Sequence, residues 1–137
     1  MPKSETVTGG CMCGAVRYAV EGEPQHNALC HCTDCRRSAG APMVGWALFA
    51  QDQVTITGTP VDFNSSKDNH RQFCGTCGTG LFFYSESAFP GLVDIQTATF
   101  DDPDAMTPGV CIQMADAPKW LKDVPDLPKF ERYPGQD

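Results

Sequence analysis

Hydrophobic and polar residues alternate along several short stretches of this chain. Val16, Tyr18 and Val20 fall on one face of the segment 15–20, which is the period-two pattern of a half-buried strand. A short strand is also expected to run into Cys30. Further strands are expected in segments of similar length: 54–58, 61–65, 81–84, 92–98 and 110–114.

The longest apolar run, 43–50, contains Trp46 and Phe49 and predicts a buried strand. Thr33 is expected to cap a short helical turn. Other segments favour turns, loops or irregular structure: a loose leader over 1–8, turns at 21–24, 40–42 and 101–104, a polar loop over 65–69, a short helix over 117–121 and an extended tail from 124. Many short strands with 13 Gly and 11 Pro predict an all-β fold.

Length and charge narrow the classes of function. A chain of 137 residues predicts one domain, assigned to 7–125 and followed by a C-terminal tail at 126–137. The formal net charge of −7 argues against binding of nucleic acid or a membrane surface, because both usually require basic residues. Residues 1–10 lack the apolar core of a secretion signal, and no apolar run is long enough to span a membrane. We therefore expect a cytoplasmic protein.

Seven of the eight cysteines lie in three tight clusters: Cys11-x-Cys13, Cys30-x-Cys32-x-x-Cys35 and Cys74-x-x-Cys77. Zinc is held tetrahedrally by four protein ligands at structural sites, and by three at catalytic sites, where the fourth position stays open. The first and third clusters together supply four thiols, and the middle cluster supplies three. We expect two zinc ions per chain, one at each group.

Disulfides are the alternative interpretation of an even number of cysteines. Clustered cysteines in a reducing compartment are more often metal ligands, so we favour metal. If the backbone from Cys30 to Cys32 is extended, both thiols face one side and His31 faces the other, which argues against His31 as a ligand. Cys111 stands alone and is expected to be a small buried hydrophobic residue.

The motifs resemble the glutathione-dependent formaldehyde-activating enzyme family, which includes the centromere-protein-V-like proteins. The resemblance covers roughly residues 7–125. It is carried by Gly10-Cys11-Met12-Cys13-Gly14, Cys30-His31-Cys32-Thr33-Asp34-Cys35-Arg36-Arg37, Gly40-Ala41-Pro42, Arg71-Gln72-Phe73-Cys74-Gly75-Thr76-Cys77-Gly78-Thr79 and Pro118-Lys119-Trp120.

The resemblance implies a β-tent of packed antiparallel sheets. It also implies a structural zinc on the residues matching Cys11, Cys13, Cys74 and Cys77, and a second zinc on those matching the middle cluster. The family activity is the condensation of glutathione with formaldehyde to S-hydroxymethylglutathione, which is classed as a carbon–sulfur lyase reaction. This chain is shorter than the named formaldehyde-activating members.

The middle cluster, Cys30, Cys32 and Cys35, is the candidate catalytic group. Three thiolates already exceed the charge of Zn²⁺ and weaken it as a Lewis acid, so this site favours delivery of a thiol over activation of water. A small-molecule thiol such as glutathione is the expected partner. Arg36 and Arg37 follow the cluster directly and are candidates for pairing with a carboxylate of that thiol.

Other residues and functions remain open from the sequence. His31 and His70 are either proton shuttles or ordinary hydrogen-bonded side chains, and Trp46 and Phe82 favour the core over a substrate platform. A non-enzymatic, zinc-stabilised interaction module is the alternative to an enzyme. A zinc-ribbon nucleic-acid binder is disfavoured by the acidic charge. The oligomeric state is not predicted.

Overall fold

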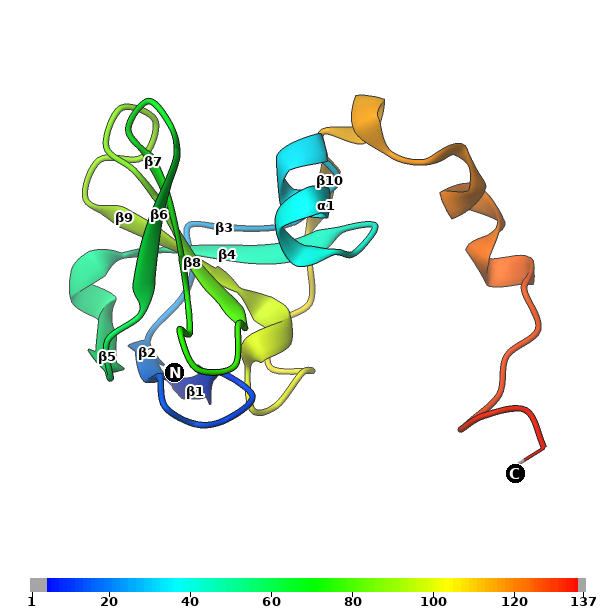
Figure 1. Cartoon of the computed structure of the whole chain (residues 1–137), viewed down its shortest axis with the longest axis horizontal. Helices are drawn as coiled ribbons and strands as arrows, with labels where there is room; N and C mark the ends of the chain where they lie inside the picture. Colours follow the sequence, from blue (N-terminus) through cyan, green and yellow to red (C-terminus); the bar gives the residue numbers. More distant parts are fainter. Residues whose placement is uncertain (1–4, 136–137) are drawn as a thin grey trace.

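The computed structural model describes residues 5–135, which form mainly short strands (Figure 1). The elements follow in this order: β1 (Thr6–Gly10), β2 (Arg17–Glu21), β3 (His26–Cys30), α1 (Thr33–Ala39), β4 (Val44–Ala50), η1 (Gln51–Gln53), β5 (Val54–Thr57), β6 (Val61–Ser66), β7 (Asn69–Phe73), β8 (Gly80–Ser85), β9 (Leu92–Gln96), η2 (Thr97–Thr99), β10 (Val110–Ile112), η3 (Met114–Asp116) and η4 (Lys119–Asp126), where η marks a 3₁₀ helix. The predicted all-β class is confirmed.

The strands form two sheets. A three-stranded sheet has the order β1-β2-β5, and a seven-stranded sheet has the order β10-β3-β4-β9-β8-β7-β6. Pairings between the described strands are antiparallel except for β10 beside β3, which is parallel. Figure 1 shows β6, β7 and β8 crossing β3 and β4 at a steep angle, so the large sheet bends like the sides of a tent.

Both faces of the large sheet are covered in its middle, which explains why β4 is apolar along its length. Ala47 and Phe49 belong to the main core, together with buried residues of β2, β8 and β9. Val44 and Trp46 belong to a second core that contains Cys30 and Cys35. Successive strand residues point to opposite faces, so one apolar run supplies both cores.

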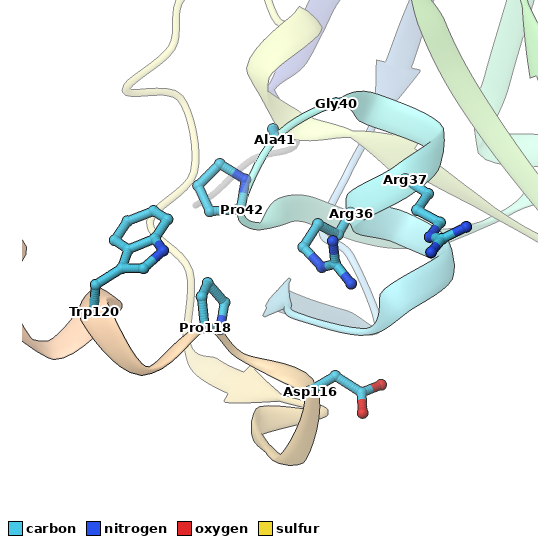
Figure 2. A pocket seen from close by; sticks show the side chains of 8 residues that line it. All are labelled: Arg36, Arg37, Gly40, Ala41, Pro42, Asp116, Pro118 and Trp120. Carbon is cyan, nitrogen blue, oxygen red and sulfur yellow. The ribbon is translucent and has the colours of Figure 1, made fainter.

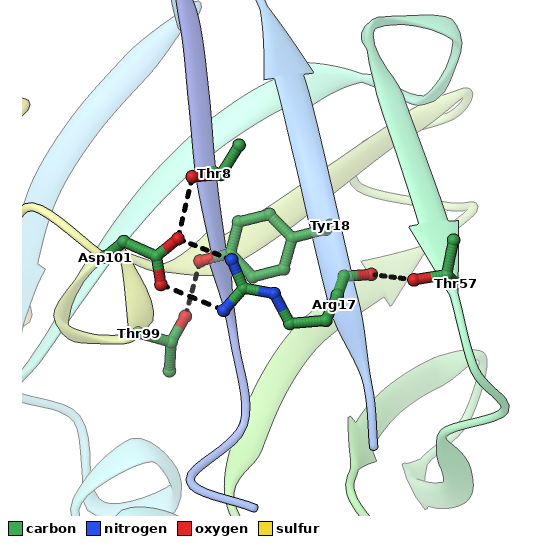
Figure 3. Close-up of polar contacts among 6 residues, drawn as sticks. All are labelled: Thr8, Arg17, Tyr18, Thr57, Thr99 and Asp101. Atoms are coloured by element: carbon green, nitrogen blue, oxygen red, sulfur yellow. Dashed lines mark hydrogen bonds and ion pairs between the residues drawn. The ribbon is translucent and has the colours of Figure 1, made fainter. Parts of the chain in front are cut away.

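The small sheet is tied to the segment that follows β9 (Figure 3). Arg17 Nη1 donates to Asp101 Oδ1 at 2.9 Å, and its second nitrogen bonds the other carboxylate oxygen. The Tyr18 hydroxyl lies 2.6 Å from Thr99 Oγ1. The Arg17 pair is half-exposed, so the buried Tyr18 ring, which packs edge-on against Phe82, contributes more to holding the layers together.

Several local predictions were wrong. The leader expected over 1–8 includes strand β1, which its edge position allows despite a polar sequence; residues 1–4 lie outside the described residues. β7 was not predicted, because its polar residues are all half-buried and show no alternation. The helix α1 is capped by the Cys32 sulfur, which accepts from Cys35 N–H at 3.2 Å, rather than by Thr33.

Cys111 is exposed, not buried as predicted. It lies on β10, the edge strand of the large sheet, opposite Leu29 of β3. An edge strand has a neighbour on one side only, so a short apolar sequence there does not guarantee burial. The flanking Val110 is also half-exposed.

The C-terminal segment leads away from the two sheets (Figure 1). The helix expected over 117–121 is present as η4, which continues to Asp126, so the extended tail begins later than predicted. The division into a domain at 7–125 and a tail at 126–137 stays a prediction. Among the described residues, no helix has both the length and the apolar character needed to cross a membrane.

Candidate metal centres

The first thiol cluster joins two turns that are far apart in the sequence. Cys11 and Cys13 follow β1, and Cys74 and Cys77 follow β7, yet all four sulfurs lie within 4.8 Å of one another. The Sγ atoms of Cys11 and Cys13 are 3.7 Å apart, and those of Cys13 and Cys74 are 3.8 Å apart. A tetrahedron with zinc–sulfur bonds of about 2.3 Å places its sulfurs about 3.8 Å apart. The four thiols therefore fit a zinc ion.

Backbone and hydroxyl groups surround this cluster with hydrogen-bond donors. Val16 N–H donates to the Cys11 sulfur at 3.3 Å, and Thr76 N–H donates to the Cys74 sulfur at 3.3 Å. The side-chain hydroxyl and backbone of Thr79 lower the pKa of Cys77 to about 5. These contacts favour the thiolate, which is the form that binds metal.

The second thiol cluster is local. Cys30 ends β3, Cys32 caps α1, and Cys35 lies in the first turn of that helix, with the three sulfurs within 4.8 Å of one another. Burial raises the pKa of Cys30 to about 12 and also raises that of Cys35. Ionising buried thiols needs a compensating positive charge, and a bound cation supplies one.

All eight cysteines are free thiols, so the structure does not support the disulfide alternative. No described His, Cys, Asp or Glu joins the three sulfurs of the second cluster as a fourth member. His31 is buried, and its Nδ1 lies 3.3 Å from the backbone oxygen of Ile112, as expected if it faces away from the sulfurs. His70 lies elsewhere, 2.8 Å from Asp62.

The second cluster lies at the wall of a cavity of about 500 Å³, which we call the thiol cavity. Its floor follows the register of the large sheet, in which paired residues of β3, β4, β9, β8 and β7 form one continuous row. Those residues are His26, Leu48, Asp94, Phe83 and Arg71. Trp46 packs edge-on against Phe83, at 6.1 Å between ring centroids, and completes the apolar part of the wall.

Two charged residues of this row were not singled out from the sequence. Arg71 Nη2 lies 3.7 Å from the Cys35 sulfur. Asp94 lies on the cavity wall, and burial raises its pKa to about 7. A lone carboxylate inside the apolar run Leu92-Val93-Asp94-Ile95 was the available signal for Asp94. Arg71 belongs to a motif that carries the family resemblance, but its largely polar strand gave no sign that the side chain reaches the cavity.

The predicted carboxylate contacts, Arg36 and Arg37, lie on α1 outside the wall of the thiol cavity; Arg36 is half-buried and Arg37 is exposed. Figure 2 shows both side chains leaving the helix at a separate surface hollow, across from Pro118 and Trp120 of the C-terminal segment. Arg37 also borders a third hollow, which shares Arg71 with the thiol cavity. Their contact with a substrate stays a prediction.

The fold and these clusters define a small all-β protein with one four-thiol and one three-thiol group, each able to hold a metal ion. The chain belongs to the glutathione-dependent formaldehyde-activating enzyme family, whose model matches residues 6–116. The resemblance in the sequence motifs is thereby confirmed.

Individual proteins agree with this assignment. A Schizosaccharomyces pombe protein named as an uncharacterized lyase is 29% identical over 108 residues, which cover 74% of this chain and 77% of the relative. A Halomonas elongata protein, provisionally named a glutathione-dependent formaldehyde-activating enzyme, is 26% identical over 83% of this chain and 78% of its own. A crystal structure of a Rhodobacter sphaeroides protein superposes with a TM-score of 0.56 at 22% identity, covering 76% of this chain and 98% of that one, which shows the shared fold.

Proposed function

We propose that the protein is a zinc-dependent enzyme of the carbon–sulfur lyase type, which joins a small thiol such as glutathione to an aldehyde such as formaldehyde. The observation that carries the proposal is the second thiol cluster at the wall of the thiol cavity. Three protein ligands beside an open cavity are typical of a catalytic zinc, whereas structural zinc is enclosed by four.

The two clusters have different roles in this proposal. Cys11, Cys13, Cys74 and Cys77 hold a structural zinc, for which their sulfur spacing is suited. Cys30, Cys32 and Cys35 hold the second zinc, which when bound supplies a position that keeps a substrate sulfur in its thiolate form.

The chain itself contributes position and exclusion of water. The cysteines are fixed by the end of β3 and the first turn of α1, and Trp46 and Phe83 line the space beside them. In the reaction, the thiolate sulfur bonds to the aldehyde carbon while the carbonyl π pair moves to the oxygen. The proton given up by the thiol returns to that oxygen. A thiolate held by metal is a weaker nucleophile, so positioning supplies much of the acceleration.

An interaction module with two purely structural zinc ions remains the alternative function. In that alternative, water, His31 or a residue of a partner closes the second site. His31 instead lies against the Ile112 carbonyl, and none of the described His, Cys, Asp or Glu side chains adds a fourth ligand. This favours the enzyme.

The test is titration of glutathione and other cellular thiols into zinc-loaded protein, followed by X-ray absorption at the zinc edge and by formaldehyde consumption. We expect the added thiol to supply a fourth sulfur to the second zinc, which is half of the zinc in the protein, and we expect aldehyde loss above the uncatalysed rate. If no thiol adds a sulfur and aldehyde loss stays at the background rate, the enzyme proposal is wrong and the interaction module replaces it.

A further inference from the structure

Arg71 has an unusual environment. Its Nη2 donates to the Cys35 sulfur at 3.7 Å, and its guanidinium lies over the Phe83 ring, with Cζ 5.2 Å from the ring centroid. Its Nη1 is buried and has no hydrogen-bond acceptor among the described residues. A buried guanidinium nitrogen without an acceptor costs free energy, so its presence calls for an explanation.

No carboxylate among the described residues forms an ion pair with this guanidinium. The ion pairs among residues 5–135 involve Arg17, His70 and Lys122, and none involves Arg71. Asp34 and Asp94 line the thiol cavity together with Arg71, but neither forms an ion pair with it. Buried arginines are usually paired with a carboxylate or a phosphate. Arg71 is therefore held in place by a thiol and an aromatic ring while part of its hydrogen-bonding capacity stays unused.

We propose that Arg71 holds an anionic oxygen of the reacting molecules in the thiol cavity. This inference rests on the proposed function. The oxygen belongs either to a carboxylate of the thiol compound or to the aldehyde, whose oxygen gains negative charge as the sulfur attacks. Both sources present the same chemistry to a guanidinium, and a charge-assisted hydrogen bond is about twice as strong as a neutral one.

The position of the guanidinium suits either source. Its contact with Cys35 places it beside the sulfur cluster, where a substrate sulfur and its neighbouring atoms would lie. Since Nη1 has little contact with solvent, the planar group must turn toward the cavity to receive a ligand, and it can do so over the flat Phe83 ring. Arg36 and Arg37, by contrast, lie outside the wall of the thiol cavity, and Arg37 is exposed and therefore screened by water.

The experiment compares three thiols of similar size on zinc-loaded protein: 3-mercaptopropionate carries a carboxylate, cysteamine an ammonium group, and 2-mercaptoethanol neither. The dissociation constant of each is measured by calorimetry, and kcat and KM by formaldehyde consumption. The variants are Arg71→Gln and Arg71→Lys. Arg36→Gln and Arg37→Gln test the competing arginines. Arg132→Gln, which removes an exposed charge in the C-terminal tail, is the matched control. Zinc content and melting temperature are recorded for every protein.

If the thiol carboxylate is the ligand, Arg71→Gln weakens binding of 3-mercaptopropionate about 10-fold or more, leaves cysteamine unaffected, and is partly rescued by Arg71→Lys. If the aldehyde oxygen is the ligand, kcat falls about 100-fold with every thiol while the dissociation constants stay unchanged. Either result supports the proposal.

Three results would overturn the inference. Arg71→Gln could match wild type in binding and rate, or Arg36→Gln or Arg37→Gln could produce the predicted loss in its place. Alternatively, Arg71→Gln could lower zinc content and affect all thiols equally, which would indicate a purely structural role. If wild type neither binds a thiol nor consumes aldehyde, the proposed function itself is wrong. If wild type does both and Arg71→Gln does so equally well, only the inference about Arg71 is wrong.

Discussion

At the scale of single residues, Asp94 stands out because folding raises the pKa of its carboxyl, whereas folding lowers the pKa of Asp62, Asp68 and Asp101. Asp94 lies on β9 between Leu48 of β4 and Phe83 of β8, and burial raises the pKa of its carboxyl from 3.8 to about 7. The folded protein therefore keeps this proton at pH values where the unfolded chain has lost it.

This difference predicts a pH-dependent contribution to stability. Between about pH 4 and pH 7 the folded state binds more protons at Asp94 than the unfolded state, so the free energy of unfolding falls as the pH rises. The Asp94→Asn variant has no titrating group at this position. Its free energy of unfolding relative to that of wild type should therefore rise by about 2–4 kcal/mol between acidic pH and pH 8. Urea unfolding of both proteins from pH 5.5 to 8 measures the difference between their free energies of unfolding. Any effect of zinc release that both proteins share cancels in this difference.

Asp101→Asn provides the control with the opposite sign. Arg17 and Thr8 lower the pKa of Asp101 to about 2, so its stabilisation is complete above pH 4 and is lost only in stronger acid. Its difference from wild type should stay constant from pH 5.5 to 8. A flat difference for Asp94→Asn over the same range would show that the Asp94 carboxyl is not shifted by burial.

At the scale of elements, the two clusters differ in what they join. Cys11 and Cys13 follow a strand of the small sheet, and Cys74 and Cys77 connect two strands of the large sheet, so their metal links the two layers. The second cluster spans only the end of β3 and the start of α1. Closing a long loop is the larger contribution to the stability of the fold.

We therefore predict unequal effects of two matched substitutions. Cys74→Ser should lower the melting temperature by roughly 10 °C or more, or prevent soluble expression, because binding free energy at that site is largely folding free energy. Cys32→Ser should leave the fold nearly intact and remove one zinc. Thermal melts combined with zinc analysis measure both. Equal destabilisation by the two changes would contradict the division into structural and catalytic sites.

Elements with regular patterning could be predicted from the sequence, and the others could not. The alternation in β2 and the apolar run of β4 correspond to real burial. β7 has the burial of a strand without its pattern, since all five residues are half-buried. Likewise the cysteines were found because each group is a short motif, whereas Arg71 and Asp94 meet the thiol cavity through strand register, which a single sequence does not reveal.

At the scale of the whole molecule, the acidic charge and the thiol content act together. The chain carries a formal net charge of −7 before any thiol ionises, so the overall charge of the protein attracts divalent cations rather than repelling them. We predict two zinc ions per chain when the protein is purified without a chelator. Elemental analysis gives the ratio. A value of one or less, together with intact disulfides by mass spectrometry, would remove the basis for both metal sites.

The order of synthesis follows from the way the first cluster is divided along the chain. Cys13 and Cys74 are separated by 61 residues, so at ribosomal rates of about 5–20 residues per second roughly 3–12 s pass between their translation. The three cysteines from Cys30 to Cys35 are made within about one second of each other. A nascent chain can thus complete the local cluster while Cys11 and Cys13 still lack their partners. The order of translation sets the order in which the two clusters can take up metal.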